Sequence, residues 1–201
     1  MISDAERNQI LATLKDFSSI AKIGTLNNLF LTTFAELVDK KQQQTVSLQE
    51  TMHQLDVLIA ILEKVRLKRE NYISLMQHVK VFVDDRVTQK KGYKILSKVI
   101  ERFELGNLDE IAEIKERILP MMKGSANKER ITLISSFINA MRQVPRQAGD
   151  QAQLAKTIEL MRSFVIELIG CFNNSNQKIR TGAQETFLAL AQILSDFKAI
   201  P

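Results

Sequence analysis

Apolar residues recur every three or four positions along most of this chain, and that spacing predicts amphipathic α-helices. The last stretch shows it well: the polar run at 173–176 can cap a helix start, and Phe187, Leu190, Leu194 and Phe197 follow at helical intervals. No run of alternating β-branched residues bounded by turn signals predicts a strand. The expected fold class is therefore all-α.

Local signals divide this pattern into helices. Two capping boxes, Ser3 with Glu6 and Ser47 with Glu50, predict helix starts. We expect helices to break near Gly24, to start again at Thr25, and to start at Asn71 and at Asp84–Asp85, with Gly106 and Asn107 closing the latter helix. Later helices are expected over 108–122, 128–143 and 151–172. In the helix at 151–172 the expected inward positions are Leu154, Ile158, Met161, Val165 and Leu168.

A weak internal repeat organises the helices. Residues 84–103 correspond to residues 175–194, so that Gln89 falls opposite Arg180 and Gly92 opposite Ala183, while Arg130 lies in a comparable relation between them. The period of roughly forty to fifty residues is typical of HEAT or armadillo units. We therefore expect one domain, residues 1–201, of stacked antiparallel helical hairpins forming an α-solenoid. Residues 1–80 supply its N-terminal hairpins and residues 81–201 its C-terminal repeats.

Composition narrows the class of protein further. The net charge is +5, and residues 81–201 hold 18 basic against 14 acidic residues. This excess fits an acidic partner and also many ordinary soluble proteins. The single cysteine, Cys171, permits no internal disulfide and is expected to be a buried, inert thiol. We expect neither a secretory signal at the N-terminus nor a membrane-spanning segment.

The strongest candidate for an anionic contact is the helix that follows Asp85. It carries four lysines within nine residues, Lys90, Lys91, Lys94 and Lys98, and Tyr93 lies among them. Apolar residues occupy the other face of the same helix. The lysines are therefore expected to form a concentrated basic surface that could hold phosphate.

Lys178 and Arg180, at the start of the last helix, could join this surface. The same two side chains could instead donate hydrogen bonds to the carbonyls of the preceding turn and stabilise the hairpin. The sequence leaves these two roles open for both residues.

No catalytic, cofactor-binding or metal-binding residues are predicted. His53 and His78 are 25 residues apart with no second cysteine to complete a metal site, and each is expected on a helix surface or between helices. Phosphate-loop, dinucleotide-binding and nucleophile-elbow motifs do not occur. The pairs Asp84/Asp85 and Asp109/Glu110 stand at expected helix starts, where negative charge is stabilising. We expect a protein that is not an enzyme and needs no cofactor.

Three segments in the C-terminal two-thirds of the chain have a recognisable sequence pattern: DDRVTQKKGYKILSKVIERF at 84–103, ANKERITLISSFINAM at 126–141, and FVIELIGCFNNSNQKIRTGAQETFLALAQIL at 164–194. In content, order and approximate spacing they resemble the ribosomal RNA processing protein twelve family of HEAT-repeat proteins. The residues that carry the resemblance are Val87, Gln89, Lys90, Lys91, Tyr93, Lys128, Arg130, Glu167, Asn176, Lys178, Arg180 and Ala183.

The resemblance implies a non-catalytic scaffold of ribosome biogenesis in the nucleolus and nucleus. Such a protein associates with rRNA and the proteins of pre-ribosomal particles, supports maturation and nuclear export of the small-subunit precursor, and contacts Ran-type karyopherin transport machinery. No membrane is implied. An alternative stays open, namely a protein-only adaptor such as an importin-like or cytoskeletal binding module. A continuous basic concave face would favour the first reading, and an exposed apolar or Asn-rich concave face the second.

Overall fold

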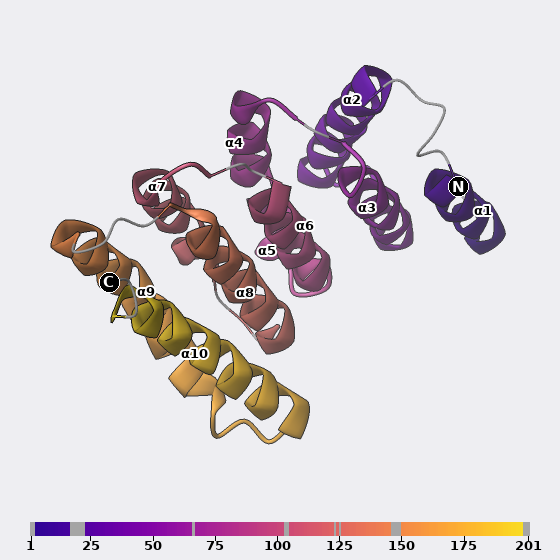
Figure 1. Cartoon of the computed structure of the whole chain (residues 1–201). Helices are drawn as coiled ribbons and strands as arrows, with labels where there is room; N and C mark the ends of the chain where they lie inside the picture. The colour runs from indigo at the N-terminus through magenta and orange to yellow at the C-terminus, as the bar shows by residue number, and fades with distance from the viewer. Residues whose placement is uncertain are drawn as a thin grey trace. The chain divides into compact units, whose positions relative to one another are not determined.

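The computed structural model describes residues 3–16, 23–65, 67–102, 105–122, 124, 126–145 and 150–198, and among them every regular element is helical (Figure 1). The all-α expectation is confirmed. The chain divides into two compact units, residues 1–102 and residues 103–201. The sequence predicts one domain whose N-terminal hairpins end at residue 80, and the division between the two units lies after Arg102.

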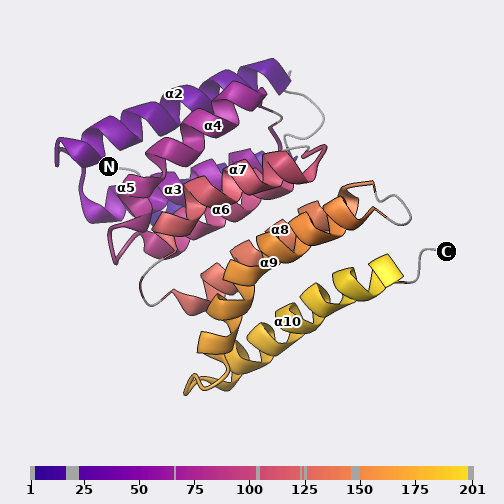
Figure 2. The ribbon, with the colours of Figure 1, turned by 90° about the vertical axis from the view of Figure 1, so that its left-hand side faces the viewer.

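The first unit holds two rows of helices. In chain order they are α1 (Asp4–Asp16), α2 (Ile23–Gln42), α3 (Leu48–Leu62), α4 (Arg69–His78), α5 (Lys80–Val83) and α6 (Gln89–Arg102). Helix α3 packs against α1 and α6 in one row, and α2 packs beside α4 and α5 in the other. Figure 2 shows α2, α4 and α5 beside α3 and α6. In the first row Asp56 pairs with Lys91, and Glu63, seven residues after Asp56, pairs with Lys98, seven residues after Lys91. Because the residue numbers rise in the same direction along both segments, α3 and α6 run parallel.

The second unit repeats this plan. Its elements are α7 (Leu108–Ile118), the 3-10 turn η2 (Leu119–Met121), α8 (Asn127–Gln143), α9 (Gln151–Cys171) and α10 (Gln177–Lys198). Helix α9 packs on α7, and α10 packs on α8. Gly182 lies near Ile131, and the Thr186 hydroxyl is 3.2 Å from that of Ser135, so α8 and α10 also run parallel.

Phenylalanine side chains pack together in the core of each unit. Phe34 lies 6.0 Å from both Phe30 and Phe82 between ring centroids in the first unit. Phe137 and Phe164 lie 5.1 Å apart in the second. All five rings are buried and belong to the core. Phe103, and the side chain of Phe197, lie outside the described residues.

Both capping boxes act as predicted at their helix starts. The Ser3 hydroxyl accepts a hydrogen bond from the Glu6 amide at 3.2 Å, while the Ser3 amide donates to Glu6 Oε2 at 2.8 Å. The Ser47 hydroxyl likewise accepts from the Glu50 amide at 3.2 Å, and α3 begins at the next residue.

Several other predicted boundaries are wrong. Helix α2 begins at Ile23, two residues before the predicted start at Thr25, and the break predicted near Gly24 falls next to residues 17–22, which lie outside the described residues. Asn71 lies inside α4, which starts at Arg69. Asp84 and Asp85 belong to a turn, and α6 begins only at Gln89.

The residue that caps α7 was assigned to the wrong helix. Asn107 has extended backbone, with φ −155°, and its Oδ1 accepts a hydrogen bond from the Glu110 amide at 3.0 Å. It therefore starts α7, whereas the sequence analysis expects it to close the helix before.

Candidate partner-binding surface

The start of α6 is fixed by hydrogen bonds to the end of α5. The Thr88 hydroxyl donates to the Phe82 carbonyl at 2.8 Å, and Gln89 Nε2 donates to the Val83 carbonyl at 3.0 Å. Asp85 Oδ1 accepts from the Val87 amide at 2.9 Å and closes the turn between the two helices. These bonds set the rotation of α6 and so decide which of its lysines face a neighbour.

Two of the four predicted lysines are engaged inside the first unit. Lys91 forms an ion pair with Asp56 of α3. Lys98 Nζ lies 3.7 Å from a carboxylate oxygen of Glu63, the residue that follows α3, and 3.0 Å from one of Glu101. Their charges are therefore used to hold α6 against α3.

The other two lysines face solvent. Lys90 and Lys94 are exposed and lie one helical turn apart. Within the part of the chain that the structure describes, neither ammonium has an ion pair or side-chain hydrogen bond. The basic surface expected from the sequence is thus reduced to this pair, which we call the free lysine pair.

Tyr93 does not belong to that surface. Its side chain is fully buried, with 0% exposed, among the largest core side chains. The sequence analysis places it beside the lysines, but Tyr93 is one residue before Lys94 and so lies about 100° around the helix. Its ring packs inside the unit and is not available for stacking on a ligand.

Of Lys178 and Arg180, only Arg180 has the turn-stabilising role that the sequence left open for both. Lys178 is exposed, and its backbone amide donates to Asn176 Oδ1 at 2.9 Å. The Arg180 guanidinium donates to the carbonyls of Asn174 at 2.6 Å and Ser175 at 3.0 Å. Arg180 therefore closes the turn between α9 and α10, while the ammonium of Lys178 stays at the surface.

The Arg180 bond recurs at repeat-related positions. Gln89 reaches the carbonyl of Val83, Arg130 that of Gly124 at 3.1 Å, and Arg180 that of Asn174, and each carbonyl lies six residues back. These are the three positions that correspond in the internal repeat. A polar side chain in the first turn of the second helix of each pair thus binds the loop before it.

One carboxylate of the first unit has a clearly shifted pKa for a structural reason. The Lys41 ammonium, 2.5 Å from Asp85 Oδ2, lowers the pKa of Asp85, and the Val87 amide adds to this effect. The pair joins the end of α2 to the turn before α6. It therefore supports the same turn that positions the free lysine pair.

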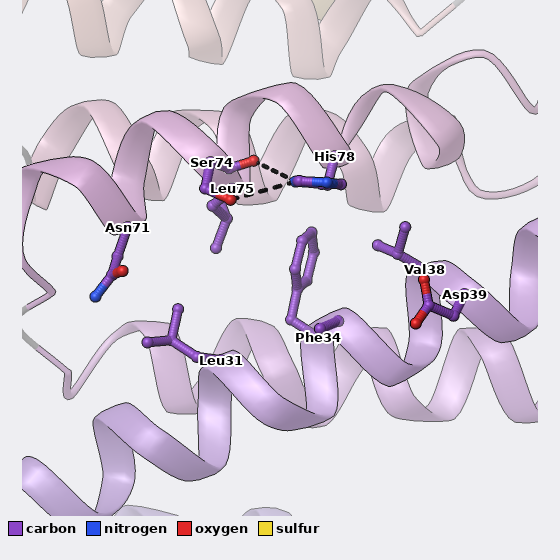
Figure 3. A pocket seen from close by; sticks show the side chains of 9 residues that line it. Leu31, Phe34, Val38, Asp39, Asn71, Ser74, Leu75 and His78 are labelled. Carbon is purple, nitrogen blue, oxygen red and sulfur yellow. Dashed lines mark hydrogen bonds between the residues drawn. The ribbon is translucent and has the colours of Figure 1, made fainter.

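A cleft of about 130 Å³ opens between α2 and α4 (Figure 3). Leu31, Phe34, Val38 and Leu75 supply its apolar lining, and polar groups stand around it, namely Asp39, Asn71, Ser74 and His78. Sequence reasoning missed this cleft. Its residues come from two helices about forty positions apart, and no local spacing signals that they meet.

The described residues offer no sign of metal binding or of a membrane span. They contain no group of three or more His, Cys, Asp or Glu that could hold a metal ion. None of their helices is both long and apolar enough to cross a bilayer. Cys171 is a buried free thiol, as predicted, and buried His53 lies between helices with Nε2 3.1 Å from an Asp4 oxygen.

Comparison with models of protein families, with curated proteins and with solved structures gave no match for this chain.

Helix α9 carries apolar side chains on a flank that no described helix covers. Lys156 pairs with Asp109 of α7, and Glu167 with Arg130 of α8, so these two mark the covered flank. Ile158 lies about 200° around the helix from Lys156, and Ile169 falls within about 20° of Ile158. Ile158, Ile166 and Ile169 are 50%, 65% and 52% exposed. We call these three residues the α9 isoleucine stripe.

The stripe corrects the predicted orientation of this helix. Ile158 was expected inward, and Leu154 and Val165 are only half-buried. Met161 and Leu168 are buried as expected, and Thr157, Leu160, Phe164 and Cys171 complete the buried face. Apolar side chains lie on more than one face of α9, so their spacing alone predicts a face that is rotated relative to the buried one.

Proposed function

We propose that this protein is a non-catalytic helical-repeat scaffold of ribosome biogenesis that contacts rRNA phosphate through Lys90 and Lys94. The single observation behind this proposal is the free lysine pair: two exposed ammonium groups one turn apart, on a helix whose other lysines already have acidic partners. Cations placed in this way bind phosphate without reading the base sequence.

The scaffold part of the proposal has separate support. In each unit parallel helices form two rows, and the turn-closing bond recurs at Gln89, Arg130 and Arg180. A repeated bond at a repeated position is what HEAT-like units stacked as an α-solenoid would have. The sequence resemblance then supplies the setting: pre-ribosomal particles in the nucleolus and nucleus, small-subunit maturation, and export with karyopherins.

A charge-matched pair of variants tests the RNA contact. Binding of the purified chain to structured ribosomal RNA is measured across a salt series for wild type, for K90Q/K94Q and for K91Q/K98Q. Both variants remove two positive charges from α6, but only the first removes the free ones. For K90Q/K94Q we expect weaker binding and a slope of log K against log salt that is shallower by about 1.4 to 1.8, the value for two lost phosphate contacts.

K91Q/K98Q is expected to keep most of the wild-type slope and to lose stability instead. Equal losses of RNA affinity in the two variants would show that only total charge matters and would remove the assigned role of Lys90 and Lys94. Absence of wild-type binding at low salt would overturn the RNA proposal.

A second candidate is a protein-only adaptor, which the α9 isoleucine stripe favours. Exposed aliphatic side chains gathered on one helix flank are typical of protein contacts. This candidate predicts that proteins co-purifying with the chain are retained by K90Q/K94Q and lost by I158S/I169S. The reverse pattern, with loss in K90Q/K94Q alone, would contradict it.

A further inference from the structure

The cleft between α2 and α4 has an apolar floor and different polar groups at its two ends. Phe34 and Leu75 are buried beneath it, and Leu31 and Val38 line its sides. Asp39 and His78 stand at one end of the cleft and Asn71 at the other (Figure 3). The cleft therefore has a direction, which a ligand with one apolar and one polar part could follow.

His78 is held in one tautomer by its own helix. Its Nδ1 lies 2.7 Å from the Ser74 carbonyl oxygen, which can only accept a hydrogen bond, so Nδ1 must carry the proton. In the neutral ring Nε2 is then a bare acceptor. The imidazole thus offers a lone pair to a ligand that donates hydrogen bonds.

Asp39 adds a second acceptor at the same end. Its carboxylate is exposed, and no described side chain binds it. Asp39 is also the only Asp, Glu, Lys or Arg among the lining residues. This end of the cleft therefore favours a cationic donor and repels phosphate.

From this arrangement we propose that the cleft binds a partner peptide in which an aliphatic side chain, such as leucine, stands next to an arginine or lysine. A volume of about 130 Å³ suits one aliphatic side chain. The neighbouring cation would donate to Asp39 and His78, and the Asn71 amide can bond to the peptide backbone, because it both donates and accepts. This site is separate from the free lysine pair and does not depend on RNA binding.

Methyl-resolved NMR of the full chain tests the proposal. The probe is the peptide acetyl-Gly-Ser-Leu-Arg-Ser-Gly-amide, compared with one peptide that has glycine for leucine and another that has glutamate for arginine. We expect saturable shifts of the Leu31, Val38 and Leu75 methyl resonances with the first peptide. The glycine peptide should give no saturable shift, and the glutamate peptide should bind at least twofold more weakly.

Two chain variants with the same charge change locate the contact. D39N removes the carboxylate at the cleft, whereas E36Q removes an exposed carboxylate one turn away on α2 that does not line it. For D39N we expect about two- to fivefold weaker binding of the arginine peptide, as for a solvent-exposed ion pair, and for E36Q no change. Both positions are exposed, so both variants should fold.

Three results would overturn the proposal: no saturable shift of the cleft methyl groups at any peptide concentration, equal affinity for the arginine and glutamate peptides, or equal losses in D39N and E36Q. Loss of RNA binding in K90Q/K94Q, or its absence in wild type, leaves these readouts unchanged, so the two proposals fail separately.

Discussion

Lys91 of α6 and Asp56 of α3 form an ion pair that joins two parallel helices of the first unit. Asp56 also lies 3.7 Å from Arg7 of α1, so one carboxylate serves three helices of the same row. The side chains of Lys91 and Asp56 are 16% and 30% exposed, which places the pair between a surface contact and a buried one.

Removing either partner of this pair should therefore lower the stability of the fold. We expect K91Q to reduce the free energy of unfolding by about 1 kcal/mol, and D56N by about 1–2 kcal/mol because it removes the carboxylate that Lys91 and Arg7 share. Among the described residues, only Arg7 keeps a second partner, Asp4. Urea unfolding of the single and double variants gives the coupling energy directly. The control K90Q should change stability by less than about 0.5 kcal/mol, and a similar loss there would contradict the division of the lysines.

Gly92 is required by the close approach of α6 to α5. A Cβ at this position would lie 2.7 Å from Val83 Cγ2, 3.0 Å from the Val83 nitrogen and 3.2 Å from the Phe82 carbonyl carbon. Two of these atoms are backbone, so the helices must separate. G92A should lower the free energy of unfolding by about 1–3 kcal/mol, although alanine is the better helix former.

The matched control for that substitution lies in α10. At Gly182 an added Cβ would meet only Ile131 Cγ2, at an ordinary 3.9 Å. G182A should therefore stabilise the chain, by about 0.5–1 kcal/mol, since the clash is absent and the gain in helix propensity remains. Thermal unfolding of G92A and G182A tests both expectations. A change of stability in the same direction in the two variants would be inconsistent with the packing at Gly92.

Arg180 is expected to matter for stability through its two loop carbonyls. R180M keeps much of the side-chain length but removes the donors, and should cost about 1–2 kcal/mol. R180Q, which introduces the residue found at repeat-related Gln89, should recover part of that loss. K178Q should be neutral in the same chemical denaturation, because its ammonium is at the surface; a loss as large as that of R180M would oppose this assignment.

The Lys41–Asp85 pair predicts a pH dependence in the acid range. The folded-state pKa of Asp85 is below its ordinary value of 3.8, so the unfolded chain binds the proton more readily. The pair's contribution is then present above the unfolded pKa and is lost as the pH falls through the lower folded value. We expect the free energy of unfolding of D85N, measured from pH 6 to pH 2, to fall less steeply with decreasing pH than that of wild type. An unchanged steepness would show that Lys41 does not stabilise the ionised form.

The α9 isoleucine stripe should affect association far more than folding. I158S/I169S removes exposed surface and should change the free energy of unfolding by less than about 1 kcal/mol, whereas F164A opens a core cavity and should cost about 3–5 kcal/mol. Sedimentation velocity over a concentration series then reports whether the stripe promotes self-association. A cost for I158S/I169S close to that of F164A would mean that a helix covers this flank.

The sequence by itself determined the helices and much of the core. Helix α8 was expected to start at residue 128 and begins at Asn127, and α9 was expected to end at residue 172 and ends at Cys171. Both capping boxes were read correctly from four-residue patterns. Such features depend on groups within one or two turns of each other, so local spacing carries the information.

The correspondence between Gln89, Arg130 and Arg180 was also visible in the sequence, but its meaning was not. Only their bonds to the carbonyls six residues back show that the repeat preserves a turn contact. For Arg180 this contact decides between two roles that a basic side chain near a helix start can equally have.

Tertiary structure alone decided which polar groups are available to a partner. Lys90 and Lys91 are neighbours in the sequence, yet one faces solvent and the other meets Asp56, because α3 runs beside one side of α6. The same holds for the cleft of α2 and α4 and for the exposed face of α9. A helix packed on more than one side has a broad apolar surface, and its periodicity does not state which part a neighbour covers. That choice depends on residues distant in the chain, so it is fixed only when the helices pack.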